Sequence, residues 1–171
     1  VGSLTSLPGD EPSVALYIDD VFVPAAPASL NNLNSIARVA VEQGPPGTLI
    51  GRNATGGVVQ IHTKDPTFTP TLDASIGYAN YNTLSASIYG SYGLTDTLAA
   101  NAAIYYTRQA SGWGKNLTTG ESLYRGWDYG GRVKLLWDAT DSTTLLLTLD
   151  RDMNVPGMYP SGNGSPGYLT G

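Results

Sequence analysis

The sequence predicts a transmembrane antiparallel β-barrel, present as a fragment of about five strands, preceded by part of a small α+β unit. Apolar and polar residues alternate strictly along five consecutive segments after residue 70, as they do in strands with one apolar face. The connections between these segments differ in length, and the aromatic residues of the apolar face fall at two levels. Together these patterns are typical of a sheet that crosses a bilayer.

The composition excludes several other classes of protein. Charged residues make up 13% of the 171 residues, and the formal net charge is −5. Soluble domains carry about 25% charged residues, and a nucleic-acid-binding surface needs clustered basic residues that this chain lacks. No apolar run approaches the roughly 18 residues of a transmembrane helix.

The part before residue 70 has mixed patterns and predicts the small α+β unit. Apolar residues at 14–23 and 58–63 predict short strands, and one or two helical turns are expected at 30–36. Pro66 and Pro70 then mark a linker.

The five alternating segments predict a meander of antiparallel strands. They lie at residues 71–79, 83–94, 98–109, 127–137 and 144–150. Because their lengths match the ~9–11 residues of tilted membrane strands, they fit a bilayer. Five strands cannot close a barrel, so we expect the chain to be a fragment or one contributor to a multi-chain barrel.

Loop lengths and aromatic positions predict which end faces outward. The connections at 95–97 and 138–142 are short, whereas 110–126 is long. Trp127 and Trp137 are ten residues apart, which corresponds to roughly 25 Å of height for a strand tilted by about 40°. The outer level is expected to hold Tyr78, Tyr106, Trp127 and Tyr129, and the inner level Tyr92 and Trp137.

A soluble β-sandwich with one buried face is the alternative that alternation alone allows. The two readings differ at Ile104, which the barrel places against lipid, and at Ala103, which it places in the lumen. In a barrel, arginine should be costly at Ile104 and much milder at Ala103.

Residues 36–66 read IARVAVEQGPPGTLIGRNATGGVVQIHTKDP, and residues 14–24 read VALYIDDVFVP. Both stretches resemble the end of the plug domain in TonB-dependent outer-membrane receptors, where the first barrel strand follows at once. The resemblance implies that residues 1–69 are the C-terminal part of a plug and that residues 70–171 are the first five barrel strands. Gln43, Pro46, Ile50, Gln60 and His62 depart from the family pattern.

The motif contains residues expected to shape the plug and two expected to make contacts. Arg52 and Asn53, in the Gly-rich turn, are candidates for pairing with a lumen carboxylate or contacting ligand. Glycine permits positive φ and proline fixes a turn. The residues expected to have a structural role are Gly44, Pro45, Gly47, Gly51, Gly56 and Gly57.

The resemblance implies a receptor in the bacterial outer membrane that takes up a scarce nutrient, most often a ferric siderophore, with energy from TonB. The segment that contacts TonB is not in this chain. Trp113 and Tyr124, in the long connection, are candidates for ligand contact, although packing at the lipid interface would explain them equally well. Rival functions are a passive pore, an adhesin barrel, or a receptor for glycans, cobalamin or small aromatics.

No enzyme, cofactor or metal site is expected. Asp19 and Asp20 are adjacent, so on a strand they point to opposite faces and cannot share a proton. His62 has no cluster of further metal ligands beside it in the sequence.

Overall fold

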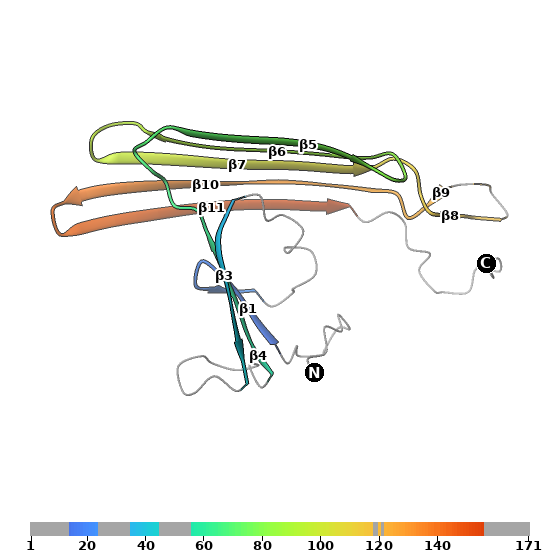
Figure 1. Cartoon of the computed structure of the whole chain (residues 1–171), viewed down its shortest axis with the longest axis horizontal. Helices are drawn as coiled ribbons and strands as arrows, with labels where there is room; N and C mark the ends of the chain where they lie inside the picture. The colour runs from blue at the N-terminus through green and yellow to red at the C-terminus, as the bar shows by residue number, and fades with distance from the viewer. Residues whose placement is uncertain (1–13, 24–34, 45–55, 118–119, 121, 156–171) are drawn as a thin grey trace. The chain divides into compact units, whose positions relative to one another are not determined.

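The structure is a computed structural model that describes residues 14–23, 35–44, 56–117, 120 and 122–155. The chain divides into two compact units, Val1–Asp65 and Pro66–Gly171. Figure 1 shows the strands of both units along the chain. Among the described residues, no helix has the length and apolar character needed to span a membrane.

The first unit contains a four-stranded mixed sheet. Its order is β2-β1-β4-β3, with β1 parallel to β4 and the other two pairs antiparallel. The strands are β1 (Val14–Ile18), β2 (Val21–Phe22), β3 (Ile36–Gln43) and β4 (Gly57–Thr63). The expected helical turns fall at 30–34, outside the described residues, and Ile36 already belongs to β3.

A two-residue turn joins β1 to β2. Asp19 and Asp20 have φ values of 46° and 65°, as a type I′ hairpin requires at both central positions. The Asp19 carboxylate also accepts hydrogen bonds from the Thr63 backbone N–H at 2.8 Å and from its hydroxyl at 2.6 Å. The acidic pair therefore shapes the hairpin and ties it to the end of β4.

The core of the first unit lies between β1 and β4. Ala15 and Val58 are fully buried, and Tyr17 packs against them. Parallel strands with buried apolar residues explain why 14–18 and 57–63 read as apolar runs.

The second unit is a five-stranded antiparallel meander, as the alternation predicted. Its order is β11-β10-β7-β6-β5, so every long strand pairs with its neighbours in sequence. The strands are β5 (Thr71–Ala79), β6 (Thr83–Gly93), β7 (Leu98–Gln109), β10 (Gly126–Thr140) and β11 (Thr143–Val155). A short hairpin of β8 (Gly114–Lys115) and β9 (Ser122–Leu123) lies in the long connection between β7 and β10.

The last two strands are longer than the sequence pattern indicated. β10 has 15 residues and β11 has 13, and they pair along almost their whole length. Leu146, which interrupts the apolar alternation, pairs with Leu136 on the polar face. The strands extend into polar residues at their ends because backbone hydrogen bonds do not depend on side-chain polarity. Hydrophobic alternation in the sequence does not reveal these polar ends.

The register confirms one apolar and one polar face. Ile88 pairs with Ile104, Val133 with Leu149, and Leu135 with Leu147, so apolar residues lie beside one another across the strands. Of these six residues, Leu135 is half-buried and the other five are exposed, as a lipid-facing surface requires. The exposed apolar and aromatic residues include Leu72, Ile76, Tyr78, Ile88, Tyr92, Ile104, Trp127, Val133, Trp137, Leu145, Leu147 and Leu149.

The two ends of the sheet differ, as the loop lengths predicted. In Figure 1 the short connections from β6 to β7 and from β10 to β11 lie at one end, and β8 and β9 lie at the other. Trp127 and Tyr129 stack near the β8–β9 end, with ring centroids 5.2 Å apart, whereas Trp137 pairs with Leu98 near the short turns. Aromatic residues thus mark both borders of the apolar band.

Candidate functional site

The polar face of the barrel unit carries a bridge between strands that are not direct neighbours. The Tyr105 hydroxyl on β7 donates to Asp152 on β11 at 2.9 Å, and it lies 3.5 Å from the Asp128 carboxylate on β10. Between them lies Gly130, which pairs with both Tyr105 and Asp152. A Cβ at Gly130 would lie 2.6 Å from the Tyr105 hydroxyl oxygen, so this bridge needs the glycine.

Two cations also face this side of the sheet. Arg132 forms an ion pair with Asp150 on the adjacent strand. Lys134 is 1% exposed and pairs in register with Asn101, which is also buried. The polar face therefore holds an ion pair and a buried cation beside the Tyr105 bridge.

Two aromatic rings of the long connection stack on each other. Trp113 and Tyr124 stack with ring centroids 3.8 Å apart and planes 7° apart. The Gln109 side-chain amide donates to the Ser111 carbonyl at 2.9 Å and to the Tyr124 carbonyl at 3.0 Å, which fixes the base of the hairpin. Trp113 remains 61% exposed, so the stack offers an accessible aromatic surface.

The plug motif is described only at its edges. Gly44 has a φ of 89° and Gly57 a φ of 143°, where side chains are disfavoured. At Gly57 a Cβ would also overlap the Glu42 carbonyl oxygen. Gly56 is described and exposed, whereas five of the predicted residues lie outside the described residues: Pro45, Gly47, Gly51, Arg52 and Asn53.

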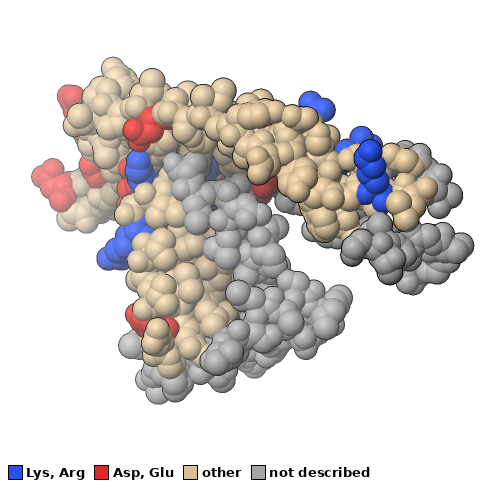
Figure 2. Space-filling model, turned by 45° about the vertical axis from the view of Figure 1, so that its right-hand side comes forward, with Lys and Arg blue, Asp and Glu red and all other residues tan. Residues whose placement is uncertain are grey.

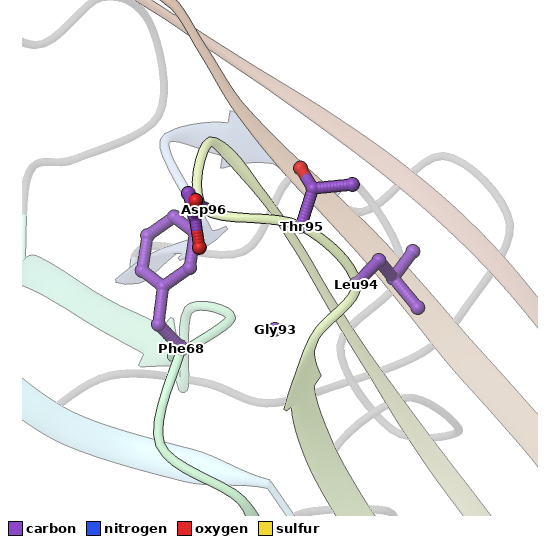
Figure 3. A pocket seen from close by; sticks show the side chains of 5 residues that line it. All are labelled: Phe68, Gly93, Leu94, Thr95 and Asp96. Atoms are coloured by element: carbon purple, nitrogen blue, oxygen red, sulfur yellow. The ribbon is translucent and has the colours of Figure 1, made fainter.

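A shallow pocket of about 380 Å³ lies at the short-turn end of the barrel unit. Figure 3 shows its lining, formed by Phe68 from the connector and by 93–96 at the turn after β6. Thr67 anchors this connector, because its N–H donates to the Ser91 hydroxyl at 2.8 Å. The pocket is therefore separate from the aromatic stack at the opposite end.

The described residues contain no group of three or more His, Asp or Glu residues able to hold a metal ion. His62 lies on β4, and its Nε2 is buried without a hydrogen-bond partner. One imidazole nitrogen is not a metal site, since zinc sites in proteins use three or four ligands.

Charges are distributed unevenly over the barrel unit. Figure 2 shows most of the acidic surface toward one side of this view, while lysines and arginines lie on both sides. Asp96, Asp138 and Asp141 lie in or beside the short turns, whereas Lys115 and Arg125 lie in the long connection.

The chain was compared with known proteins in sequence and in structure. A scan against models of known protein families found no match. The chain is 29% identical over 136 residues to the ferrioxamine receptor of Yersinia enterocolitica, covering 80% of this chain and 18% of that protein. It is 37% identical over 59 residues to the pesticin receptor of Yersinia pestis, covering 34% of this chain and 9% of the relative. Both relatives are thus several times longer than the chain.

A solved structure matches most of the fold. The pyoverdine outer membrane receptor FpvA of Pseudomonas aeruginosa PAO1, bound to pyoverdine, superposes with a TM-score of 0.69 and 18% identity over 83% of this chain and 21% of that one. The chain therefore resembles the TonB-dependent outer-membrane receptors in sequence and in fold. In a barrel of this fold, an exposed apolar face lies against lipid and the opposite polar face lines the lumen.

Sequence reasoning located the aromatic pair of this chain but not the bridge on its polar face. Trp113 and Tyr124 were predicted separately, and the hairpin brings them together; their role in ligand contact remains a prediction. Tyr105 and Asp152 are 47 residues apart and two strands apart, so no local pattern joins them. The available signal was Gly130, which lies between Asp128 and Arg132 on the polar face of the strand.

Proposed function

We propose that the full-length protein is a TonB-dependent receptor for energy-coupled uptake of a scarce nutrient, a ferric siderophore, across the outer membrane. The observation that carries this proposal is the direct succession, in one chain, of a plug-type unit and a meander with a lipid-facing surface. Relatives named as receptors for ferrioxamine and pesticin support it.

Within this proposal, residues 1–69 form the C-terminal part of the plug and residues 70–171 form the first five barrel strands. Arg52 and Asn53 pair with carboxylates of the lumen wall or contact the ligand. The motif residues Gly44, Pro45, Gly47, Gly51, Gly56 and Gly57 shape the plug. TonB supplies the energy for uptake by acting on the plug.

The aromatic stack is the proposed outer contact for the ligand. A rigid, exposed pair of rings supplies contact area at a low cost in conformational entropy, and Trp113 presents such a surface. Trp113→Ala in the full-length receptor should weaken binding of its ferric siderophore about tenfold, corresponding to ~1.4 kcal/mol. Trp137→Ala, at the opposite border of the barrel unit, is the control and should leave the affinity unchanged.

Transport in cells tests the function directly. Cells lacking the gene should fail to grow on the cognate ferric siderophore as the sole iron source, and an uncoupler of the inner-membrane proton gradient should stop uptake but not surface binding. Uptake that continues after uncoupling would instead identify a passive pore. Growth on every siderophore tested, with loss of growth on a glycan or on cobalamin, would redirect the substrate assignment.

The alternative of a multi-chain barrel also has a direct test. The mass of the protein purified from outer membranes should exceed that of this 17.9 kDa chain and correspond to one long polypeptide. Several copies of a short chain would show that the barrel is assembled from subunits.

A further inference from the structure

Two arginines of the barrel unit lie on the lipid-facing side rather than in the lumen. Arg108 pairs in register with Leu84 and with Trp127, both on the apolar face. Arg151 pairs with Gly131 and alternates with Leu149 and Met153 along β11. Because successive residues of a strand point to opposite faces, both guanidinium groups belong to the surface that meets lipid.

These arginines differ from the cations of the lumen face. Arg132 has Asp150 as its ion-pair partner, and Lys134 is buried. Arg108 and Arg151 are exposed, and neither forms a hydrogen bond or ion pair with any residue in the part of the chain that the structure describes. Their positive charges therefore face the membrane, and no described residue neutralises them.

The position of Arg151 makes this charge costly in pure hydrocarbon. Its partner Gly131 lies four residues from Trp127, at the outer border, and six from Trp137, at the inner border. Arginine on the lipid face of a barrel is most unfavourable at the midplane and nearly neutral at the interface. The long side chain can direct its guanidinium group toward the outer border, where Arg108 already lies beside Trp127.

We propose that Arg108 and Arg151 bind the phosphate of an anionic lipid in the outer leaflet, on either side of the stacked Trp127 and Tyr129. The two arginines lie on β7 and β11, which flank β10, and the stacked rings lie on β10 between them. Guanidinium groups suit phosphate because their planar donors match its oxygens. Aromatic rings at the border of the membrane accommodate the glycerol and upper acyl region of the same lipid.

The test uses the full-length receptor in vesicles and does not require its nutrient. Phosphatidylcholine vesicles contain increasing fractions of phosphatidic acid with brominated acyl chains, and quenching of tryptophan fluorescence reports the lipid next to the barrel. The wild-type receptor should prefer phosphatidic acid over phosphatidylcholine. Each of Arg108→Gln and Arg151→Gln should reduce this preference about fivefold, since one arginine near an anionic surface contributes roughly that factor.

Arg125→Gln is the matched control, because it removes the same charge from the long connection instead of the lipid face. An equal loss of preference in Arg125→Gln would show a general effect of net charge and overturn the proposal. An unchanged preference in the double variant Arg108→Gln/Arg151→Gln would also overturn it. Heat-modified electrophoretic mobility confirms that each variant has folded.

Two further measurements test whether free phosphate, or a carboxylate of the protein, neutralises the two arginines instead of lipid. Inorganic phosphate added to pure phosphatidylcholine vesicles should leave the stability of the wild-type receptor unchanged; stabilisation that Arg108→Gln/Arg151→Gln abolishes would assign a free-phosphate site instead. Arg151→Gln should raise the stability in pure phosphatidylcholine, since an uncompensated charge leaves the hydrocarbon. A loss of stability there would reveal a carboxylate partner on a further strand and overturn the role of Arg151.

Discussion

Replacing Ile104 by arginine tests which face of the sheet meets lipid. Ile104 is 56% exposed on the apolar face, and it pairs with Ile88 and Gly131. Four residues separate Gly131 from Trp127 at the outer border. At about 3.3 Å per residue and a tilt near 40°, Ile104 therefore lies about 10 Å below the outer aromatic level, within a band about 25 Å tall.

The expected cost follows from this depth. A lipid-facing arginine costs about 2–4 kcal/mol at the midplane and about 0–1 kcal/mol near the interfaces, so we expect Ile104→Arg to destabilise the folded barrel by about 2–3 kcal/mol. Arg151 lies in the same cross-strand row, so a second guanidinium group there also experiences like-charge repulsion. Reversible urea unfolding of the full-length receptor in phosphatidylcholine vesicles measures the difference.

The control must be a polar-face position with room for a long side chain. The sequence suggested Ala103, but Ala103 is 3% exposed and pairs with Arg132, so arginine there would be destabilising for packing and charge reasons. Ser87 is the better position, since it faces the lumen and its hydroxyl forms only an exposed hydrogen bond with Ser75. Ser87→Arg should cost less than about 1 kcal/mol; a cost equal to that of Ile104→Arg would refute the assignment of the two faces.

Three further changes test individual contacts. Gly57→Ala should destabilise the plug unit by about 1–3 kcal/mol because of its positive φ, seen as faster proteolysis within residues 1–65; unchanged cleavage would contradict this. Tyr105→Phe removes the hydrogen bond to Asp152 and should cost about 1–2 kcal/mol in urea unfolding. The same loss in an Asp152→Ala background, which has no acceptor at this position, would show that the bond contributes nothing. Arg132→Gln breaks the ion pair with Asp150, which is partly exposed, so its cost should stay below about 1 kcal/mol and diminish with salt; a salt-independent loss above that range would indicate a structural role beyond the pair.

The sequence predicted the barrel strands well because their environment imposes a simple rule. Apolar and polar residues must alternate along a strand between lipid and lumen, because successive side chains point to opposite faces. Ile104, Val133 and Leu149 are exposed apolar residues on the lipid side. The rule weakens at strand ends, where polar residues extend β10 and β11 beyond the apolar band. It also does not show which lumen residues are buried, as Lys134 demonstrates.

Contacts between distant strands were beyond the sequence pattern. The Tyr105–Asp152 bridge depends on the register of three strands and on the space above Gly130. The stacking of Trp113 on Tyr124 depends on a hairpin that closes inside the long connection. Neither register nor hairpin closure is encoded by the spacing of two residues alone.

The sequence by itself determined the fold class, the order of the two units and the face of each barrel residue, since alternation and the plug-like motif are local properties of the chain. The tertiary structure decided which side chains meet: the paired charges of the lumen, the aromatic stack, and the isolation of Arg108 and Arg151 on the lipid face. The physical reason is that a strand fixes the direction of its side chains within two residues, whereas their partners come from neighbouring strands whose register only the folded sheet sets.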